Sequence, residues 1–546
     1  AVFATVGGAM VAADPAFAKT DVDKLTIGGE ARVRYEIRTG TFFGTSTGAG
    51  GNESAASHRI RVSVGYDLTP DVAFFAQLQD ARVWGSEQGA GGQVFSGIGA
   101  VSSANQNGTG VDLHQGYILV KNVLISGLSL KAGRQEIIYG DHRLFGNFGW
   151  SQIGNSFDGV KLSLSASAAD LDLFWARIVD SEGATTFNGS SAGASGGAPI
   201  FPGAGTKGST DQDIFGAYLT VKAIKNWTIE PYYFLLVDRR SSATAIAGTT
   251  PAVTTTTTSC LAAAVSALCA AIPGASIGST SVSTAIGSTA AVGLNSPQAP
   301  DQTRSTLGGR INGKQGGLDF TYEGAIQFGA IASTANRAAG NQVRDLHINA
   351  NAHALKTGYT FESVPMKPRL GFEFDYASGD NCASTIGGRT ADCNKHFNTF
   401  DNLFPTNHFH YGYMDLMAWR NMVNYQVMFD IKPSPVSKLQ FNYIIHRLAR
   451  TTDAWYRAGQ VAYATPAATN QAASLGQELD VHYWHTFKEK FKFDIGFGHF
   501  FGGEFIEKSN PANALSQGFA AASQGAAAVG GNGDQNWGYV MGSILF

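Results

Sequence analysis

The sequence of 546 residues lacks several features that would place it in a familiar class. It contains no run of eighteen or more apolar residues, which argues against a transmembrane helix. Neither sign of charge is in excess, because 39 Lys and Arg nearly balance 42 Asp and Glu, and the net charge of −3 excludes a strongly basic nucleic-acid binder. No G-x-S-x-G, H-E-x-x-H or P-loop motif is present, so we expect neither enzymatic activity nor a cofactor.

Cysteine is scarce, with four residues in the whole chain. Cys260 and Cys269 lie nine positions apart, Cys382 and Cys393 eleven apart, and both pairs fall in loop-like stretches. In an oxidising compartment such local pairs are expected to form two disulfides. A zinc site is the alternative, but neither pair has the C-x-x-C spacing typical of one.

The first eighteen residues suggest the compartment. Residues 1–18, "AVFATVGGAMVAADPAFA", are small and apolar and end in an A-x-A pattern at Ala16–Ala18. This is typical of a secretory signal peptide whose basic start is missing, although an ordered first strand or helix is the alternative. We therefore expect residues 19–546 to form the folded domain of an exported protein.

Alternation of apolar and polar residues is what the sequence has in abundance. In "FKFDIGFGHFF" (491–501), Phe491, Phe493 and Ile495 alternate with Lys492 and Asp494. The same pattern recurs in 25–37, 59–68, 227–238, 318–326, 369–376, 421–431, 439–446, 479–487 and 537–546. A period of two predicts β-strands, and about ten residues suffice for a tilted strand to cross a bilayer.

The connections between these runs also alternate, between eight short turns and nine long segments, which gives eighteen strands. An even strand number with short turns on one side and long loops on the other is typical of bacterial outer-membrane barrels. Lipid offers the backbone no hydrogen-bond partner, so a closed sheet is required. We predict an all-β fold: one 18-stranded antiparallel transmembrane β-barrel with short periplasmic turns and long extracellular loops.

Two predicted strands depart from the alternation. In "SLKAGRQEI" (129–137), Arg134 shares its parity with apolar residues, and in "AFFAQLQDARVW" (73–84), Asp80 and Arg82 share theirs with Leu78. A β-bulge that re-aims these side chains and a position above the lipid are both compatible with the sequence.

The polar face of each strand should line the lumen. By parity the candidate pore-lining residues are Glu30, Arg32, Arg34, Arg38, Arg59, Arg61, Asp67, Glu230, Arg310, Asp319, Glu323, Arg369, Glu373, Asp375, Asp430, Asp480 and Asp494. The early strands are rich in arginine and the middle strands in acidic residues, which predicts a transverse field that orients hydrated, dipolar solutes. The alternative is that these charges simply pair with one another as a scaffold.

Within this set, a basic ladder on the first two strands is expected to face acidic side chains of the eleventh and thirteenth strands across water. The ladder consists of Arg32, Arg34, Arg59 and Arg61, and the acidic side chains are Glu323, Glu373 and Asp375. Loops 239–303 and 379–419 are candidates to fold over or into the lumen. The cluster "HFHYGYMD" (408–415) is compatible with a metal site, but a polar loop with aromatic packing is the stronger interpretation.

Four stretches resemble the alginate export family: "FAQLQDARVWG" (75–85), "LHQGYILVKN" (113–122), "LKAGRQEIIYGDHR" (130–143) and "RLFGNFGWSQIGNSFDGVKL" (143–162). The resemblance implies an eighteen-stranded outer-membrane barrel that carries hydrophilic, often anionic, solutes. The alginate exporter itself needs a strongly electropositive constriction, whereas the lumen set above holds more acids than bases. We therefore expect a related solute class rather than alginate.

The expected function is passive or facilitated passage of small hydrophilic solutes, charged or sugar-like, through the outer membrane of a Gram-negative cell. The alternative is a barrel that acts as a scaffold, surface receptor or adhesin and whose lumen is closed by loops. Expected partners are outer-membrane lipid and lipopolysaccharide. The barrel assembly machinery is a further one, because the terminal Phe546, with Ile544 and Val540 on its face, resembles the C-terminal signal of outer-membrane proteins.

We predict that Cys260 pairs with Cys269 and Cys382 with Cys393. Thiol labelling of the unfolded, unreduced protein is then expected to modify no cysteine, and labelling at all four positions would refute both disulfides. Their effect on barrel stability should be small, because both closed loops are short and lie outside the hydrogen-bonded wall.

Overall fold

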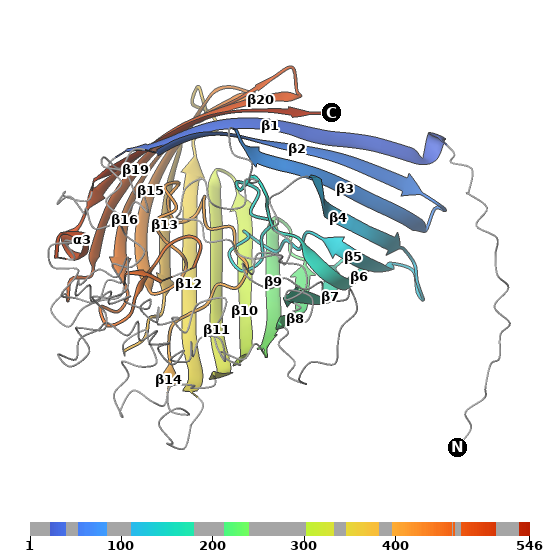
Figure 1. Ribbon diagram of the computed structural model, residues 1–546, viewed down its shortest axis with the longest axis horizontal. Coiled ribbons are helices and arrows are strands. Elements are labelled where there is room, and N and C mark those ends of the chain that lie inside the picture. The colour runs from blue at the N-terminus through green and yellow to red at the C-terminus, as the bar shows by residue number, and fades with distance from the viewer. Residues whose placement is uncertain are drawn as a thin grey trace, which may run out of the picture.

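A computed structural model describes residues 22–39, 53–84, 111–179, 212–239, 302–331, 346–381, 396–460, 462–464, 471–508 and 534–546. Within these residues eighteen strands form one antiparallel wall, and β1 pairs with both β2 and β21, so that the sheet closes on itself. Figure 1 shows the C-terminal end of the chain lying beside β1. The predicted fold, a closed 18-stranded antiparallel barrel, is confirmed.

The wall strands are β1 (Leu25–Thr39), β2 (Glu53–Asp67), β3 (Val72–Val83), β4 (Val111–Val120), β5 (Leu128–Gln135), β6 (Phe157–Ser165), β7 (Ala169–Val179), β8 (Gln212–Val221), β9 (Trp227–Asp238), β10 (Gln302–Gln315), β11 (Leu318–Ile331), β12 (Leu346–Thr360), β13 (Arg369–Ala377), β15 (Met422–Ser434), β16 (Ser437–Leu448), β19 (Ser474–Phe487), β20 (Phe491–Gly502) and β21 (Gln535–Leu545). The smaller elements are η1 (Val22–Lys24), β14 (His396–Phe397), β17 (Trp455–Tyr456), β18 (Ala462–Ala464) and α3 (Glu504–Lys508). Among the described residues no helix is long and apolar enough to span a membrane.

The alternation seen in the sequence separates the two faces of the wall. On β1, Arg32 and Arg34 are buried, whereas Val33 and Tyr35, which alternate with them, are exposed on the outside. The outer face is apolar because it contacts lipid, and the inner face can hold charge because protein and water lie inside the barrel. The signal-like residues 1–18, all four cysteines and nearly all of loop 239–303 lie outside the described residues.

The residues that break the alternation stay on the outer face and pair there. Arg134 of β5 binds Asp158 of β6 in a two-pronged contact of 2.8 and 2.7 Å. Asp80 of β3 accepts hydrogen bonds from Arg82 at 2.7 Å and from His58 at 3.3 Å. Because each charge has an opposite partner beside it, the cost of placing it at the wall is reduced.

Two connecting segments lie inside the barrel and pack against each other. The first, residues 136–156 between β5 and β6, is called here the crossing segment; the second, residues 396–421 between β13 and β15, is called the inner loop. Their main chains meet at Phe145 and Phe404, where Gly146 donates to the Phe404 carbonyl at 2.9 Å. Phe145 and Phe404 are almost fully buried, so the centre of the barrel has an aromatic core.

The ring is closed by the last residue of the chain. The main chain of Phe546 donates to the Gly29 carbonyl at 3.1 Å and accepts from the Gly29 amide at 2.8 Å. Glycine is needed here, because a Cβ at position 29 would lie 2.3 Å from the Arg61 carbonyl oxygen and 2.6 Å from the Phe546 ring.

We predict that Gly29→Ala weakens closure of the barrel by about 1–3 kcal/mol, since the added methyl overpacks the seam. The measurement is the thermal midpoint of the folded form, together with its yield on an unheated denaturing gel. Gly65→Ala on the adjacent strand is the matched control, because a Cβ there would meet no atom closer than 3.8 Å. Equal effects of the two substitutions would contradict the prediction.

Candidate functional site: the crossing segment in the lumen

Arginine side chains of β1 and β2 point inward and are withdrawn from water. Arg32, Arg34, Arg38, Arg59 and Arg61 are between 4% and 7% exposed. A buried guanidinium is costly unless its N–H groups are bonded, so the location of their partners determines what these residues do.

Most of those partners are main-chain carbonyls of the crossing segment. Arg32 donates to the Gly149 and Ser151 carbonyls at 2.8 Å each, and Arg34 donates to the Trp150 carbonyl at 2.7 Å. The guanidinium of Arg34 also lies 3.9 Å from the centre of the Trp150 ring.

The β2 arginines extend the same contact. Arg59 donates to the Ser151 carbonyl at 2.9 Å, and Arg61 donates to the Ile153 carbonyl at 3.0 Å. An irregular segment inside a barrel has no ladder to satisfy its carbonyls, and these arginines supply the missing donors.

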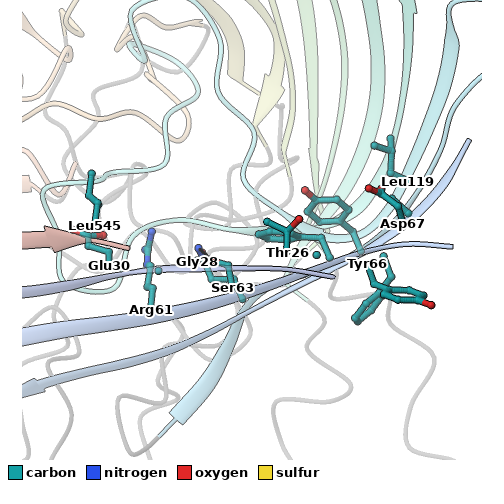
Figure 2. A pocket seen from close by; sticks show the side chains of 16 residues that line it. Thr26, Gly28, Glu30, Arg61, Ser63, Tyr66, Asp67, Leu119 and Leu545 are labelled. Carbon is teal, nitrogen blue, oxygen red and sulfur yellow. Dashed lines mark hydrogen bonds between the residues drawn. The ribbon is translucent and has the colours of Figure 1, made fainter. Parts of the chain in front are cut away.

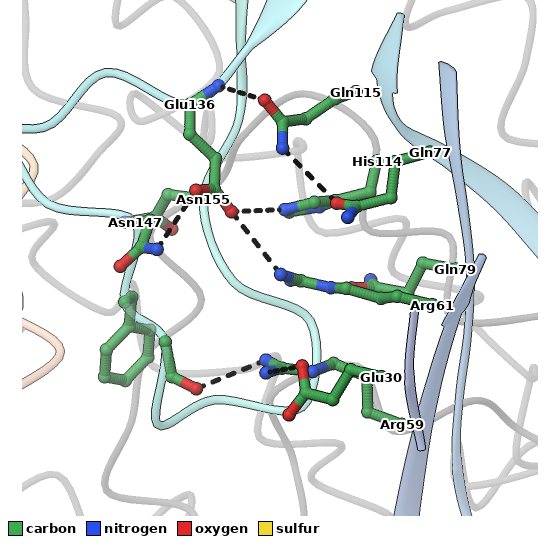
Figure 3. A network of polar contacts seen from close by, with 12 residues as sticks. Glu30, Arg59, Arg61, Gln77, Gln79, His114, Gln115, Glu136, Asn147 and Asn155 are labelled. Atoms are coloured by element: carbon green, nitrogen blue, oxygen red, sulfur yellow. Dashed lines mark hydrogen bonds and ion pairs between the residues drawn. The ribbon is translucent and has the colours of Figure 1, made fainter. Parts of the chain in front are cut away.

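Glu136, the first residue of the crossing segment, is the centre of a second set of contacts (Figure 3). Its carboxylate accepts from His114 at 2.9 Å, from Asn147 at 3.1 Å and from Arg61 at 3.4 Å. Burial raises the pKa of this carboxyl, but the His114 hydrogen bond and the Arg61 charge outweigh burial, so the pKa lies below its usual range. The carboxylate is therefore charged at neutral pH and fixes the point where the segment enters the lumen.

Arg143, in the middle of the crossing segment, binds a different part of the wall. Its guanidinium contacts Glu373 and donates to Asp375 at 2.9 Å, both on β13, and it also donates to the Tyr411 hydroxyl of the inner loop at 2.8 Å. Arg143, Glu373 and Asp375 are each at most 2% exposed. Lys356 of β12 adds a second cation 2.9 Å from Glu373.

A third attachment joins the segment to β10. Asp141 accepts from Arg310 at 2.6 Å, and Arg310 also pairs with Glu230 of β9. His410 of the inner loop donates to the Asp141 carbonyl at 2.6 Å. Burial and then the nearby Arg143 charge lower the pKa of His410 to about 4, so the imidazole is neutral at pH 7.

These attachments show that the segment crosses the barrel. Going round the wall from β1 through β21, β20, β19, β16 and β15, β13 is the sixth strand reached. The carbonyls of 149–153 therefore bind the basic wall, while Arg143 binds the acidic wall on another side. The expected basic and acidic rows do not face each other across open water, since the crossing segment lies between them and binds both.

The other candidate residues take part in smaller contacts on the wall. Arg369 binds Asp319 in a two-pronged contact of 2.8 and 2.6 Å and lies 3.6 Å from Asp430. Glu323 accepts from the Tyr232 hydroxyl at 3.0 Å.

Three acidic candidates and Arg38 complete the set. Arg38 donates to the Met414 carbonyl of the inner loop at 3.0 Å, and Asp480 accepts from the Tyr413 amide at 3.4 Å. Asp494 accepts from the Tyr539 hydroxyl at 2.9 Å, whereas Asp67 is exposed near the short turns.

The alternation of side chains along the strands did not predict a role for three residues of the crossing segment: Glu136, Asp141 and Arg143. The sequence treats 137–154 as one more long loop on the outside, but the structure places it inside. One signal distinguishes it, because the segment contains Phe145, Phe148 and Trp150 where loops such as 181–210 are rich in Gly, Ala and Ser. Residues 408–415 form part of the inner loop, where His408 stacks on Trp150 at 4.1 Å and lies 3.0 Å from Asp415.

A cavity of mixed polar and aromatic lining, which includes Phe75 and Tyr117, lies at the short-turn rim of β1 to β4 (Figure 2). Its volume is about 530 Å³, and Glu30, Arg61, Ser63, Asp67 and Gln77 are among its lining residues. Arg61 lines this cavity and also donates to the Ile153 carbonyl, so one side chain joins the cavity to the crossing segment. Its volume is in the range of ordinary small-molecule sites.

The closed wall and charged interior define an outer-membrane β-barrel of a channel and export class. The chain belongs to the alginate export family, whose profile matches residues 23–519. It is therefore a protein of the bacterial outer membrane. No curated protein matches the sequence.

Some solved barrels of similar extent are similar to this chain at low identity. OccK11 (OpdR) of Pseudomonas aeruginosa is 10% identical, with 96% of this chain and 97% of that chain covered and a TM-score of 0.46. OccAB1 of Acinetobacter baumannii is 11% identical over 97% and 98%, with a TM-score of 0.49. The outer membrane protein OprD of Pseudomonas aeruginosa is 11% identical over 98% and 97%, with a TM-score of 0.48. We base no conclusion about function on these likenesses.

We predict that Arg143→Gln destabilises the barrel interior by about 3–5 kcal/mol, because Glu373 and Asp375 then remain buried without this partner. Thermal unfolding and limited proteolysis within 136–156 measure the effect. Lys367→Gln is the matched control, since Lys367 pairs with Glu362 at 3.1 Å on an exposed turn and its loss should leave both readouts unchanged. Unaltered unfolding of Arg143→Gln would show that the crossing segment is held by other contacts.

Proposed function

We propose that the protein is a diffusion channel for small hydrophilic solutes, charged or sugar-like, and that the crossing segment sets its aperture. The observation that carries this proposal is the cavity of about 530 Å³ at the short-turn rim, whose lining residue Arg61 also binds the crossing segment. A solute entering from the short-turn rim would pass the residues of β1 to β4 that line the cavity and reach the crossing segment at Arg61.

The way the segment is attached supports a role in the aperture. It is held by side-chain contacts from Arg32, Arg59, Arg310 and Glu373 rather than by strand pairing with the wall. Side-chain contacts of this kind can be exchanged one at a time for contacts with water or solute. The main-chain ladder of the wall offers no such exchange without opening the barrel.

The charge distribution supports a small hydrated solute. Cationic groups on β1 and β2 and anionic groups on β13 give the interior a transverse field, which favours dipolar or zwitterionic molecules over apolar ones. A polyanion such as alginate would approach Glu373 and Asp375 as well as the arginines, so the mixed charge favours smaller solutes.

A closed scaffold or receptor is the second candidate, and one observation favours it. Phe145, Phe157, Phe174, Phe234 and Phe404 pack together between the crossing segment and the wall with ring centres 4.8–6.0 Å apart. An aromatic core of this density would resist rearrangement of the segment.

We further propose that outer-membrane lipid, including lipopolysaccharide, surrounds the wall and that the barrel assembly machinery recognises the last strand. Val540, Ile544 and Phe546 are 42%, 48% and 55% exposed on the outer face of that strand. This apolar row at the seam faces outward, where a partner can contact it.

We predict that the protein gives single-channel currents in planar bilayers. Two double variants should separate the effect of the arginine charges from the effect of their hydrogen bonds to the crossing segment. Arg59→Lys with Arg61→Lys keeps both charges but loses the forked hydrogen bonds, so conductance should rise without a change in ion preference. Arg59→Ala with Arg61→Ala should raise conductance and also shift the reversal potential toward cations, more strongly at low salt.

The outcomes distinguish the two candidate functions. Absence of currents from the wild type and from both double variants would favour the closed scaffold. Currents whose ion preference is unchanged in the alanine variant at low salt would show that these arginines only support the crossing segment.

A further inference from the structure

The strand β12 reverses the alternation that β1 shows. Its inner face carries the buried apolar residues Leu346, Ile348, Ala350, Ala352 and Ala354. Its outer face carries His347, Asn349, Asn351 and His353, the first two exposed and the last two half-buried. We call these four residues the β12 outer stripe.

The inner face of β12 is explained by the filled lumen. Leu346 and Ile348 pack with Ile331 of β11 and Phe397 of β14, and the three alanines belong to the main core of the barrel. Apolar residues are buried there by protein rather than exposed to a water-filled lumen. This packing explains the apolar inner face of β12. It does not explain the amide and imidazole side chains on the outer face.

The outer stripe lies at a height where neighbouring side chains are apolar. Asn349 is directly opposite Phe328 of β11, and Asn351 is directly opposite Ile326. Directly opposed residues in an antiparallel pair share a face of the sheet, and Phe328 and Ile326 are 46% and 51% exposed on it. The apolar surface of the barrel therefore extends to the level of both amides.

Polar groups at this level need partners that lipid chains cannot provide. Within the described part of the chain, the amide side chains of Asn349 and Asn351 have no hydrogen-bond partner. His353 is hydrogen-bonded through Nδ1 to the Tyr322 hydroxyl at 2.8 Å. The stripe thus presents both donors and acceptors outward.

We propose that the β12 outer stripe is the contact surface of a dimer in the membrane, and that the partner is a second copy of this chain. A primary amide has two donors and one acceptor oxygen, so a row of asparagines is complementary to a copy of itself. Two barrels inserted in the same direction are related by a two-fold axis along the membrane normal. Such an axis brings the same stripe of both copies face to face in an isologous contact.

The residues flanking the stripe fit such a contact. Ile326 and Phe328 on one side and Tyr376 on the other form an apolar and aromatic border. The border is open at one end, where the exposed His396 of β14 lies opposite His347. The partner barrel supplies hydrogen-bond donors and acceptors, which surrounding hydrocarbon lacks. The border residues exchange contacts with lipid for contacts with the partner at little cost.

The test counts copies of the full-length protein in lipid vesicles by photobleaching of a fluorophore on the N-terminal amine. The wild type should show two bleaching steps at high protein-to-lipid ratio and one step on dilution. Asn349→Val with Asn351→Val should raise the dissociation constant of the dimer about tenfold or more, since each copy loses two hydrogen-bonding side chains.

Gln477→Val on β19 is the matched control, because it also removes an exposed outward amide, on a strand that β13, β15 and β16 separate from β12. It should leave the dissociation constant unchanged. If the double variant does not fold, each single substitution should give a smaller shift of the same sign. Single-step bleaching of the wild type at every ratio, a trimer, or an undiminished dimer in the folded valine variant would overturn the proposal.

Discussion

The interior of this barrel depends on one constraint: the carbonyls of the irregular crossing segment need hydrogen-bond donors. Inside a closed wall, the carbonyls of residues 149–153 have neither a neighbouring strand nor bulk water to bind. Arg32, Arg34, Arg59 and Arg61 meet that need, and in turn the carbonyls allow four cations to be buried side by side. Each set of groups would be costly without the other.

The same dependence explains why charge is distributed so unevenly around the wall. The crossing segment presents carbonyl oxygens toward β1 and β2 and a guanidinium toward β13, so one wall must be basic and another acidic. The transverse field expected from the sequence thus arises from a structural requirement. In the proposed channel, the charges that orient a solute are the ones that hold the segment in place.

The sequence predicted the wall well because strand alternation and loop length are local properties. The exposure of Val33 between the buried Arg32 and Arg34 can be predicted without knowledge of distant residues. The direction of the crossing segment depends instead on contacts such as Arg143 with Asp375, which are 232 positions apart. The reversed parity of β12 was missed for a related reason, since its apolar inner face follows from how the lumen is filled.

The seam between β1 and β21 has a consequence for biogenesis. Ten residue pairs join these two strands, from Glu30 with Leu545 to Thr39 with Asn536, so the first and last strands of the wall are neighbours. The ring cannot be complete before β21 has been synthesised. A chain that lacks β21 would present two bare sheet edges to the membrane, so the loss of this one strand would open the whole wall.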